Sequence, residues 1–538
     1  MKRILKYILP AAAMTLTMGL SSCIGDLDVD KNVLDPNKDT KFEVEGLFNK
    51  CYANLAMEGN AGGGSTDIIY PDAGFTGLVR QMWNSNELTT DEAICGWGDD
   101  GIATFIDNVY DAAHPMLAMY YQRLALGISY CNQYLKVASG YNPTMTAEVR
   151  FVRALQYYLL MDGWGNIPFA ENIEKPVQID RKAAYEWIEK ELTEIEPLLA
   201  EPKAKKSTDA GYGRADKAAA WFLMMRLYLN AEVYTGTAQW NKAAEYAQKV
   251  ISSDYRLNTT NVGRWTSYQM LFMGDNGETD AAYEAVLPLF ADGITTTQYG
   301  CSEFLIASTF DANMHANPYD NAATNGVSIG WSGNRARPNL VRKFFPIGDV
   351  PQKESYETAE IAGDDRALFC GVGRELNNNE RGKFTDGYGV AKFTNFKTDG
   401  SAGKDPTFAD TDFFLFRVAE AYLAYAEATA RMNGNNTTAE GTKCINDLRK
   451  RAHAQERNSG SFSLDDLLDE WSREFYFEGI RRPTLIRFGK FGGNNGYNWQ
   501  WKGGSFEGRN FAEYRNIFAI PAKDLVANGN MKQNPGYK

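Results

Sequence analysis

Cys23 is the residue whose surroundings point most directly to a chemical modification. Basic residues precede an apolar run from Ile8 to Leu20, and two serines stand directly before the cysteine. This order is typical of a secretory signal, and the run is too short to span a bilayer as a mature helix. Cleavage before Cys23 frees a thiol and an amine for acylation, and several acyl chains anchor a protein stably. We therefore predict a lipoprotein signal peptide over residues 1–22, the alternative being an ordinary signal peptide with a chance cysteine.

The body that remains after cleavage is acidic and rich in aromatic residues. The 538-residue chain has a net charge of −12, and removing Lys2, Arg3 and Lys6 with the signal brings it to −15. Such a charge argues against nucleic acid as a partner and against electrostatic docking on anionic lipid. Phe, Trp and Tyr make up 13% of the chain. In an exported acidic protein this surplus favours surfaces on which sugars stack.

One segment near the carboxyl end carries enough charge to raise the question of catalysis. Its charged residues are Arg473, Glu474, Glu478, Arg481 and Arg482. Ion pairs and backbone caps explain such a cluster well. Glycosidases need two carboxyl groups across a cleft at a set separation, which neighbours on one helix do not supply. We therefore predict a structural role here, with a glycoside hydrolase as the less favoured alternative.

The elements that must position these residues are mainly helices. Apolar residues recur with helical spacing in several blocks, most clearly over 214–251, where small alanines allow two helices to pack closely. This pattern is typical of tetratricopeptide-like helix pairs. We predict a mainly α fold, with helical repeats over about 41–252 and 413–480. A large loop-rich region, over about 59–113 and 253–412, should carry the binding chemistry.

Four motifs occur in order along the mature chain, 23–538. They are residues 150–158 followed by 163–168, residues 416–428, residues 470–482, and residues 520–521 with 533–537. Together they resemble the hallmarks of the SusD/RagB family of Bacteroidetes outer-membrane nutrient-binding lipoproteins. The acidic stretch 24–30 also resembles the surface-export signal of lipoproteins from this phylum. Several other segments look close to a starch-binding member of the family.

The resemblance implies an architecture and a role. The expected architecture is a tetratricopeptide-like, SusD-like domain with a looped region on one side. The expected protein is anchored in the outer membrane, exposed on the cell surface, and seated as a lid over a SusC-like TonB-dependent transporter. It has no catalytic activity and requires no cofactor. Its expected ligand is an α-glucan of the starch type, with dextran, another polysaccharide or a peptide as the alternative cargo.

The resemblance also implies a glycan site made of aromatic and polar side chains. The matching positions are Asp72, Arg80, Trp97, Asp100, Tyr299 and Trp331. The three aromatic residues would form an arc that suits a curved α-glucan, and the polar residues would bind its hydroxyl groups. Asp100 departs from the family member, which has an amide there. Because a carboxylate only accepts hydrogen bonds, some contacts to the sugar hydroxyl groups would have to reverse, which bears on the preferred linkage.

A structural calcium ion is a further expectation. The chain has only three histidines, none spaced to share a helix face, so a histidine-based zinc site is improbable. Asp410 and Asp412 offer alternate acidic oxygens of the kind that calcium prefers, and the resemblance to the starch-binding relative implies a structural calcium ion at these positions. A third ligand should come from the loop 275–280. Without it, Asp410 or Asp412 would simply cap the helix expected over 414–431.

Overall fold

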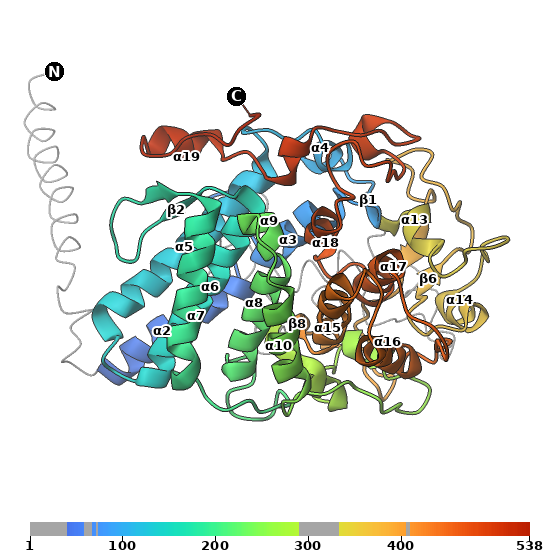
Figure 1. Cartoon of the computed structure of the whole chain (residues 1–538), viewed down its shortest axis with the longest axis horizontal. Helices are drawn as coiled ribbons and strands as arrows, with labels where there is room; N and C mark the ends of the chain where they lie inside the picture. Colours follow the sequence, from blue (N-terminus) through green and yellow to red (C-terminus); the bar gives the residue numbers. More distant parts are fainter. Residues whose placement is uncertain (1–39, 59–66, 71–73, 290–332, 405–408, 538) are drawn as a thin grey trace, which may run out of the picture.

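A computed structural model describes residues 40–58, 67–70, 74–289, 333–404 and 409–537. Helices dominate these residues (Figure 1). The helices are α2 (Thr40–Ala56), α3 (Leu78–Glu87), α4 (Ile102–Ile106), α5 (Pro115–Ala138), α6 (Pro143–Trp164), α7 (Arg181–Ile195), α8 (Lys217–Leu229), α9 (Ala231–Thr235), α10 (Trp240–Ile251), α13 (Pro338–Val341), α14 (Ser355–Ala362), α15 (Ala419–Met432), α16 (Ala439–Arg451), α17 (Leu464–Phe475), α18 (Arg481–Arg487) and α19 (Ala522–Ala527). Short 3₁₀ turns occupy Glu196–Leu198, Gln269–Phe272, Asp280–Glu284, Lys502–Gly504 and Glu513–Asn516.

Successive helices pack in pairs, as the alanine pattern predicts. α5 packs on α6, α6 on α7, α8 on α10 and α15 on α16, while α10 also packs on α15 and so joins the two helical parts of the chain (Figure 1). In α10, Ala243, Ala244 and Ala247 are buried, and such small side chains let two helix backbones approach closely. The predicted mainly α, tetratricopeptide-like scaffold is therefore confirmed.

The helix starts follow from local residue types. Asn142 caps α6 by accepting hydrogen bonds from the amides of Thr144 and Met145, and a proline takes the first helical position. Asp216 caps α8 in the same way. The segment 414–417 differs from expectation, because it is a strand rather than the start of a helix. Its sequence, Phe-Leu-Phe-Arg, is mostly bulky and aromatic, which favours a buried strand over the helix that begins at Ala419.

In the part of the chain that the structure describes, strands form three small antiparallel sheets. Four strands pair in the order β1 (Ala93–Cys95), β5 (Asn334–Ala336), β7 (Tyr388–Val390) and β6 (Phe369–Cys370). Two further pairs are β2 (Ile167–Phe169) with β3 (Val177–Ile179), and β4 (Ala285–Leu289) with β8 (Phe413–Arg417). In the first sheet, Cys95 stands opposite Asn334. This register places two parts of the predicted loop-rich region, far apart in sequence, side by side in one sheet.

The charged carboxyl-terminal segment is part of the protein interior. Arg417 is fully buried and forms ion pairs with Glu284 (3.0 Å), Glu474 (2.7 Å) and Glu478 (2.8 Å). Burial opposes the ionisation of Glu474, but the positive charges of Arg451, Arg417 and a third arginine outweigh it and hold its pKa well below the usual value. The carboxylate form of Glu474 is therefore favoured, which does not suit a proton donor. The geometry of this cluster supports the structural role that the sequence predicts.

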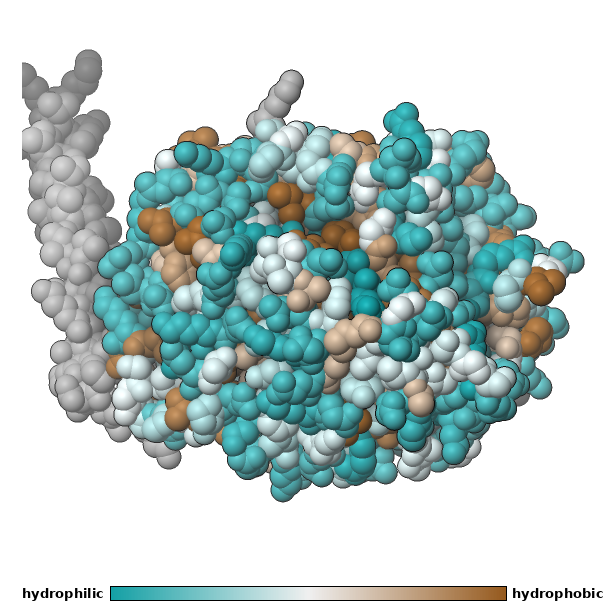
Figure 2. All heavy atoms as spheres, in the orientation of Figure 1, coloured by the Kyte–Doolittle hydropathy of each residue, from teal (hydrophilic) through white to brown (hydrophobic). Residues whose placement is uncertain are grey.

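The face of the molecule seen in Figure 2 is largely hydrophilic. Figure 2 shows teal residues over most of the visible surface, with hydrophobic residues in scattered patches. Within the described residues, no helix combines the length and the apolar character needed to cross a bilayer.

Candidate glycan-binding site

Trp97 lies just beyond β1, at the edge where β1 pairs with β5. The amide of Gly96 donates to the carbonyl of Gly333 (2.9 Å), which extends the ladder towards the tryptophan. The indole is partly exposed and packs directly on Gly333, so closely that a Cβ atom there would lie 2.2 Å from Trp97 Cε2. A glycine at position 333 is therefore what allows the indole to occupy this place.

Arg80 reaches the same loop from α3. Its Nη2 lies 3.5 Å from Oδ2 of Asp99, and the Asp99 side chain is 38% exposed whereas that of Arg80 is 13% exposed. The guanidinium also lies over Phe75, 5.5 Å from the ring centroid, and Phe75 stacks on Tyr70 at 4.1 Å with the planes 6° apart. Arg80 is thus held in place while the carboxylate that it faces remains open to solvent.

The loop that carries Trp97, Asp99 and the exposed Asp100 ends at Gly101, where His114 fixes it. His114 Nδ1 accepts from the amide of Leu117, so Nε2 carries the proton and donates to the carbonyl of Gly101 (3.0 Å). Burial lowers the pKa of His114 to about 4, despite the acidic residues nearby. The ring is therefore neutral at pH 7 and holds the loop against the start of α5.

Three of the predicted site residues lie in the described part of the chain, and Arg80 is linked to the loop that carries the other two by its ion pair with Asp99. Arg80 comes from α3, while Trp97 and Asp100 come from the loop between β1 and α4. Helix α4 contacts both α3 and β1 (Figure 1). Asp72, Tyr299 and Trp331 lie outside the described residues, as does the predicted lipid attachment site, Cys23.

Sequence reasoning singled out Asp100 and passed over its neighbour. Asp99 is the residue that faces Arg80. The adjacent pair of aspartates was the available signal, but a loop sequence does not reveal which of two carboxylates turns towards a cation in another element.

Asp410 and Asp412 are buried directly before β8, so they do not cap a helix. Asp412 Oδ2 accepts from the Tyr212 hydroxyl (2.7 Å), and Asp410 Oδ2 lies 3.7 Å from Lys397 Nζ. The loop expected to supply a third ligand meets Asp412 through the Asn276 amide, which exchanges hydrogen bonds with its backbone. Within the residues that the structure describes, no three His, Cys, Asp or Glu side chains are grouped to hold a metal ion. Calcium here stays a prediction.

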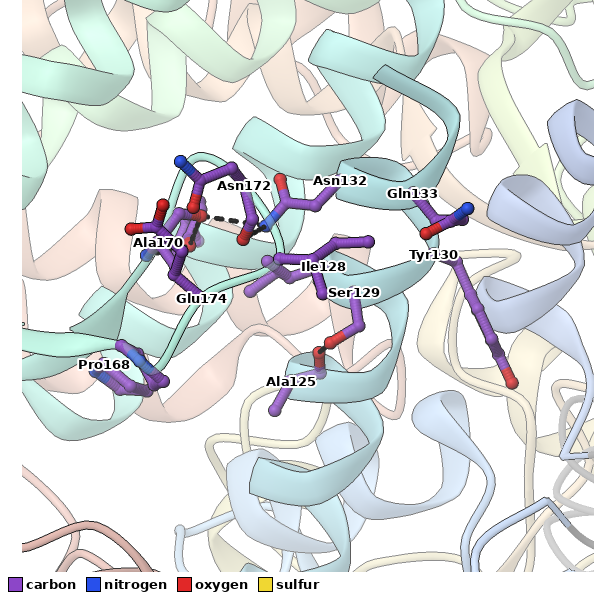
Figure 3. A pocket seen from close by; sticks show the side chains of 13 residues that line it. Ala125, Ile128, Ser129, Tyr130, Asn132, Gln133, Pro168, Ala170, Asn172 and Glu174 are labelled. Atoms are coloured by element: carbon purple, nitrogen blue, oxygen red, sulfur yellow. Dashed lines mark hydrogen bonds between the residues drawn. The ribbon is translucent and has the colours of Figure 1, made fainter. Parts of the chain in front are cut away.

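A separate pocket of about 320 Å³ lies between α5 and the segment that follows β2 (Figure 3). Asn132 donates to the carbonyls of Ala170 (2.9 Å) and Asn172 (3.1 Å), which holds this segment against α5. Ile128 and Pro168 contribute apolar walls. Its lining includes none of the predicted glycan-site residues, so it is distinct from the surface around Trp97.

Comparison with known proteins places the chain in a family. Residues 310–537 match the model of the SusD family, and residues 27–229 match a model described as starch-binding and associating with the outer membrane. The chain is 38% identical to the starch-binding protein SusD of Bacteroides thetaiotaomicron, with 99% of each chain covered. It is 23% identical to the SusD-like protein P2 of Formosa agariphila, over 97% of this chain and 99% of the relative.

Solved structures share the fold. A SusD superfamily protein from Parabacteroides distasonis superposes with a TM-score of 0.65 at 18% identity, covering 93% of this chain and 99% of that one. Surface glycan-binding protein A from Bacteroides uniformis gives the same TM-score and identity, with 92% and 99% covered. With the full-length match at 38% identity, these likenesses establish that the chain belongs to the SusD family.

Proposed function

We propose that this protein is a cell-surface glycan-binding lipoprotein that captures an α-glucan of the starch type. The observation that carries the proposal is the partly exposed Trp97 indole in the loop whose Asp99 pairs with Arg80, in a chain 38% identical over its full length to a starch-binding protein. A partly exposed indole offers a flat apolar face to the C–H groups of a pyranose ring. Arg80 donates to sugar hydroxyls, and Asp99 and Asp100 accept from them.

The proposed arc of stacking rings adds to Trp97 the predicted residues Tyr299 and Trp331, which lie outside the described residues.

Binding without catalysis fits the placement of the acids. Asp99 forms an ion pair with Arg80 at 3.5 Å. Glu474 and Glu478 are buried in ion pairs with Arg417. A glycosidase needs one carboxyl group that holds a proton and a second across a cleft, and neither cluster provides such a pair. The family relatives are likewise named as binding proteins.

The partner and the location follow from family membership. The proposed partner is a SusC-like TonB-dependent transporter, which receives the captured glycan. The proposed location is the outer surface of the outer membrane, in keeping with the description of the family model that matches residues 27–229. Because the body is acidic, it gains little from electrostatic attraction to anionic lipid. A lipid on Cys23 therefore supplies the membrane attachment in this proposal.

Isothermal titration tests the ligand and the site together. The purified protein is titrated with maltoheptaose, dextran and a β-glucan, and heat with an α-glucan is expected. Trp97→Ala should weaken this binding at least several-fold. Tyr141→Ala is the matched control, since Tyr141 is an exposed aromatic residue in the turn between α5 and α6 (39% exposed). Absence of heat with every α-glucan would overturn the proposal, and equal affinities for the Trp97→Ala variant and the wild type would misplace the site.

A further inference from the structure

A second loop next to Trp97 is held by buried arginines. The Arg335 side chain on β5 is fully buried and donates to the carbonyls of three residues in the loop that precedes β7. These acceptors are Arg381, Lys383 and Asp386. Arg374 adds hydrogen bonds to the carbonyls of Phe384 and Gly387. Five carbonyl groups of one short loop are thus bound by two guanidinium groups.

Burying charged guanidinium groups costs free energy. We interpret this cost as a sign that the loop must keep one shape. Burial lowers the pKa of Arg335 to about 10, so the side chain is still charged at neutral pH in an environment that disfavours charge. Its guanidinium is planar and presents its donors in a fixed fork. Carbonyl groups bound to it can shift only together. The loop 381–387 is therefore preorganised rather than adaptable.

Phe384 is the aromatic residue among the exposed residues of this loop, which also include Gly382, Lys383 and Thr385. Its ring is 37% exposed, and its other side lies against Gly96, where an added Cβ atom would be 2.6 Å from Phe384 Cε1. Gly96 directly precedes Trp97, the residue with the proposed stacking indole. Arg335 lies under the ring as well, with its Cζ 5.7 Å from the centroid. The Phe384 ring is thus a second flat apolar face, and it is fixed against Gly96, the residue directly before Trp97.

We propose that Phe384 is a further stacking residue of the glycan site, which contacts the pyranose unit next to the one on Trp97. The proposal rests on the proposed function and extends its surface by one subsite. A single exposed hydrophobic residue is ordinary on a protein surface. Phe384 differs because its backbone is fixed by buried cations and because its ring packs on Gly96, the residue directly before Trp97. With no hydroxyl or amide, it contributes a ring face alone, so it senses the length of the chain more than its hydroxyl pattern.

Titration of two ligands of different length tests this subsite. Phe384→Leu keeps an apolar side chain but removes the flat ring, whereas Phe384→Tyr keeps the ring. Aromatic contacts of about 0.5–1.5 kcal/mol correspond to about 2- to 13-fold in affinity. Phe384→Leu should weaken maltoheptaose binding by that factor and maltotriose binding by less, while Phe384→Tyr stays within twofold of wild type. Tyr141→Leu, which changes an equally exposed ring outside the site, should leave both affinities unchanged.

The outcomes separate this inference from the function on which it rests. If Trp97→Ala weakens α-glucan binding but Phe384→Leu stays within twofold of the wild type, the subsite is overturned and the proposed function is kept. Equal losses for maltotriose and maltoheptaose in Phe384→Leu would also overturn it, since they would indicate a general change in the loop. Absence of α-glucan binding by the wild type would overturn both. Thermal unfolding of each variant checks that the fold is kept.

Discussion

Gly333→Ala gives the sharpest test of how the site is built, because it moves the Trp97 indole without changing it. The new Cβ atom would stand 2.2 Å from Cε2, 2.5 Å from Nε1 and 2.6 Å from Cζ2 of Trp97. Carbon atoms in contact lie about 3.5–4.0 Å apart, so the ring must retreat by roughly 1.3 Å or more. The clash is with a side chain at the surface, so we expect the indole to turn away while the β1–β5 pairing remains.

The loss in affinity follows from the lost stacking contact. A stacked aromatic contact of about 0.5–1.5 kcal/mol predicts about 2- to 13-fold weaker α-glucan binding. The change is measured by isothermal titration with maltoheptaose, and near-ultraviolet circular dichroism reports the new environment of the indole. Gly98→Ala is the control, because a Cβ atom at Gly98 has nothing within 4 Å. Wild-type affinity for Gly333→Ala, or an equal loss for Gly98→Ala, would refute the reasoning.

Three further predictions concern stability, pH and anchoring. Glu474→Gln removes one charge from a buried ion-pair network and should lower the free energy of unfolding, measured by chemical denaturation, by about 3–5 kcal/mol. Glu186→Gln, in an exposed pair on α7, should change it little, and similar losses for the two variants would contradict the structural role of Glu474. Between pH 6.5 and about 4 the unfolded chain protonates His114 more readily than the folded one, so this residue should remove up to about 3 kcal/mol of stability as pH falls through that window. His114→Asn, which keeps an N-cap acceptor, should flatten the pH dependence, and an unchanged slope would assign it to other groups. Cys23→Ala should release the protein from membranes into the soluble fraction, and persistent membrane attachment would show another anchor.

Much of the scaffold could be predicted from the sequence because it depends on repeated local signals. Alanines at helical spacing, such as Ala243 and Ala247, lie at helix contacts as expected. The strand over 413–417 was missed because Phe-Phe-Leu-Phe reads as an apolar run of either type. Helix α3, within the segment expected to be loop-rich, was missed because its asparagines and serine are poor helix formers. Packing against α5 decides its conformation instead.

The residues of the candidate site also differ in how far the sequence predicts them. Arg80 and Trp97 could be identified by matching motifs, and the structure links Arg80 through Asp99 to the loop that carries Trp97. The importance of Phe384 has no signal in the sequence, because it depends on backbone carbonyl groups that Arg335 and Arg374 bind. The same limit applies to Asp99. Motifs identify the chemistry of a side chain, whereas its neighbours depend on how distant loops close.

The pairing of Cys95 with Asn334 also has a consequence for biogenesis. Contacts between residues so far apart in sequence form late, because the intervening chain must first be ordered or looped out. A nascent chain therefore has no ligand-binding face until more than half of it has been synthesised and has returned to the first strand. Glycan affinity then reports completed assembly, so retention on a starch column would separate mature molecules from partly folded or truncated ones.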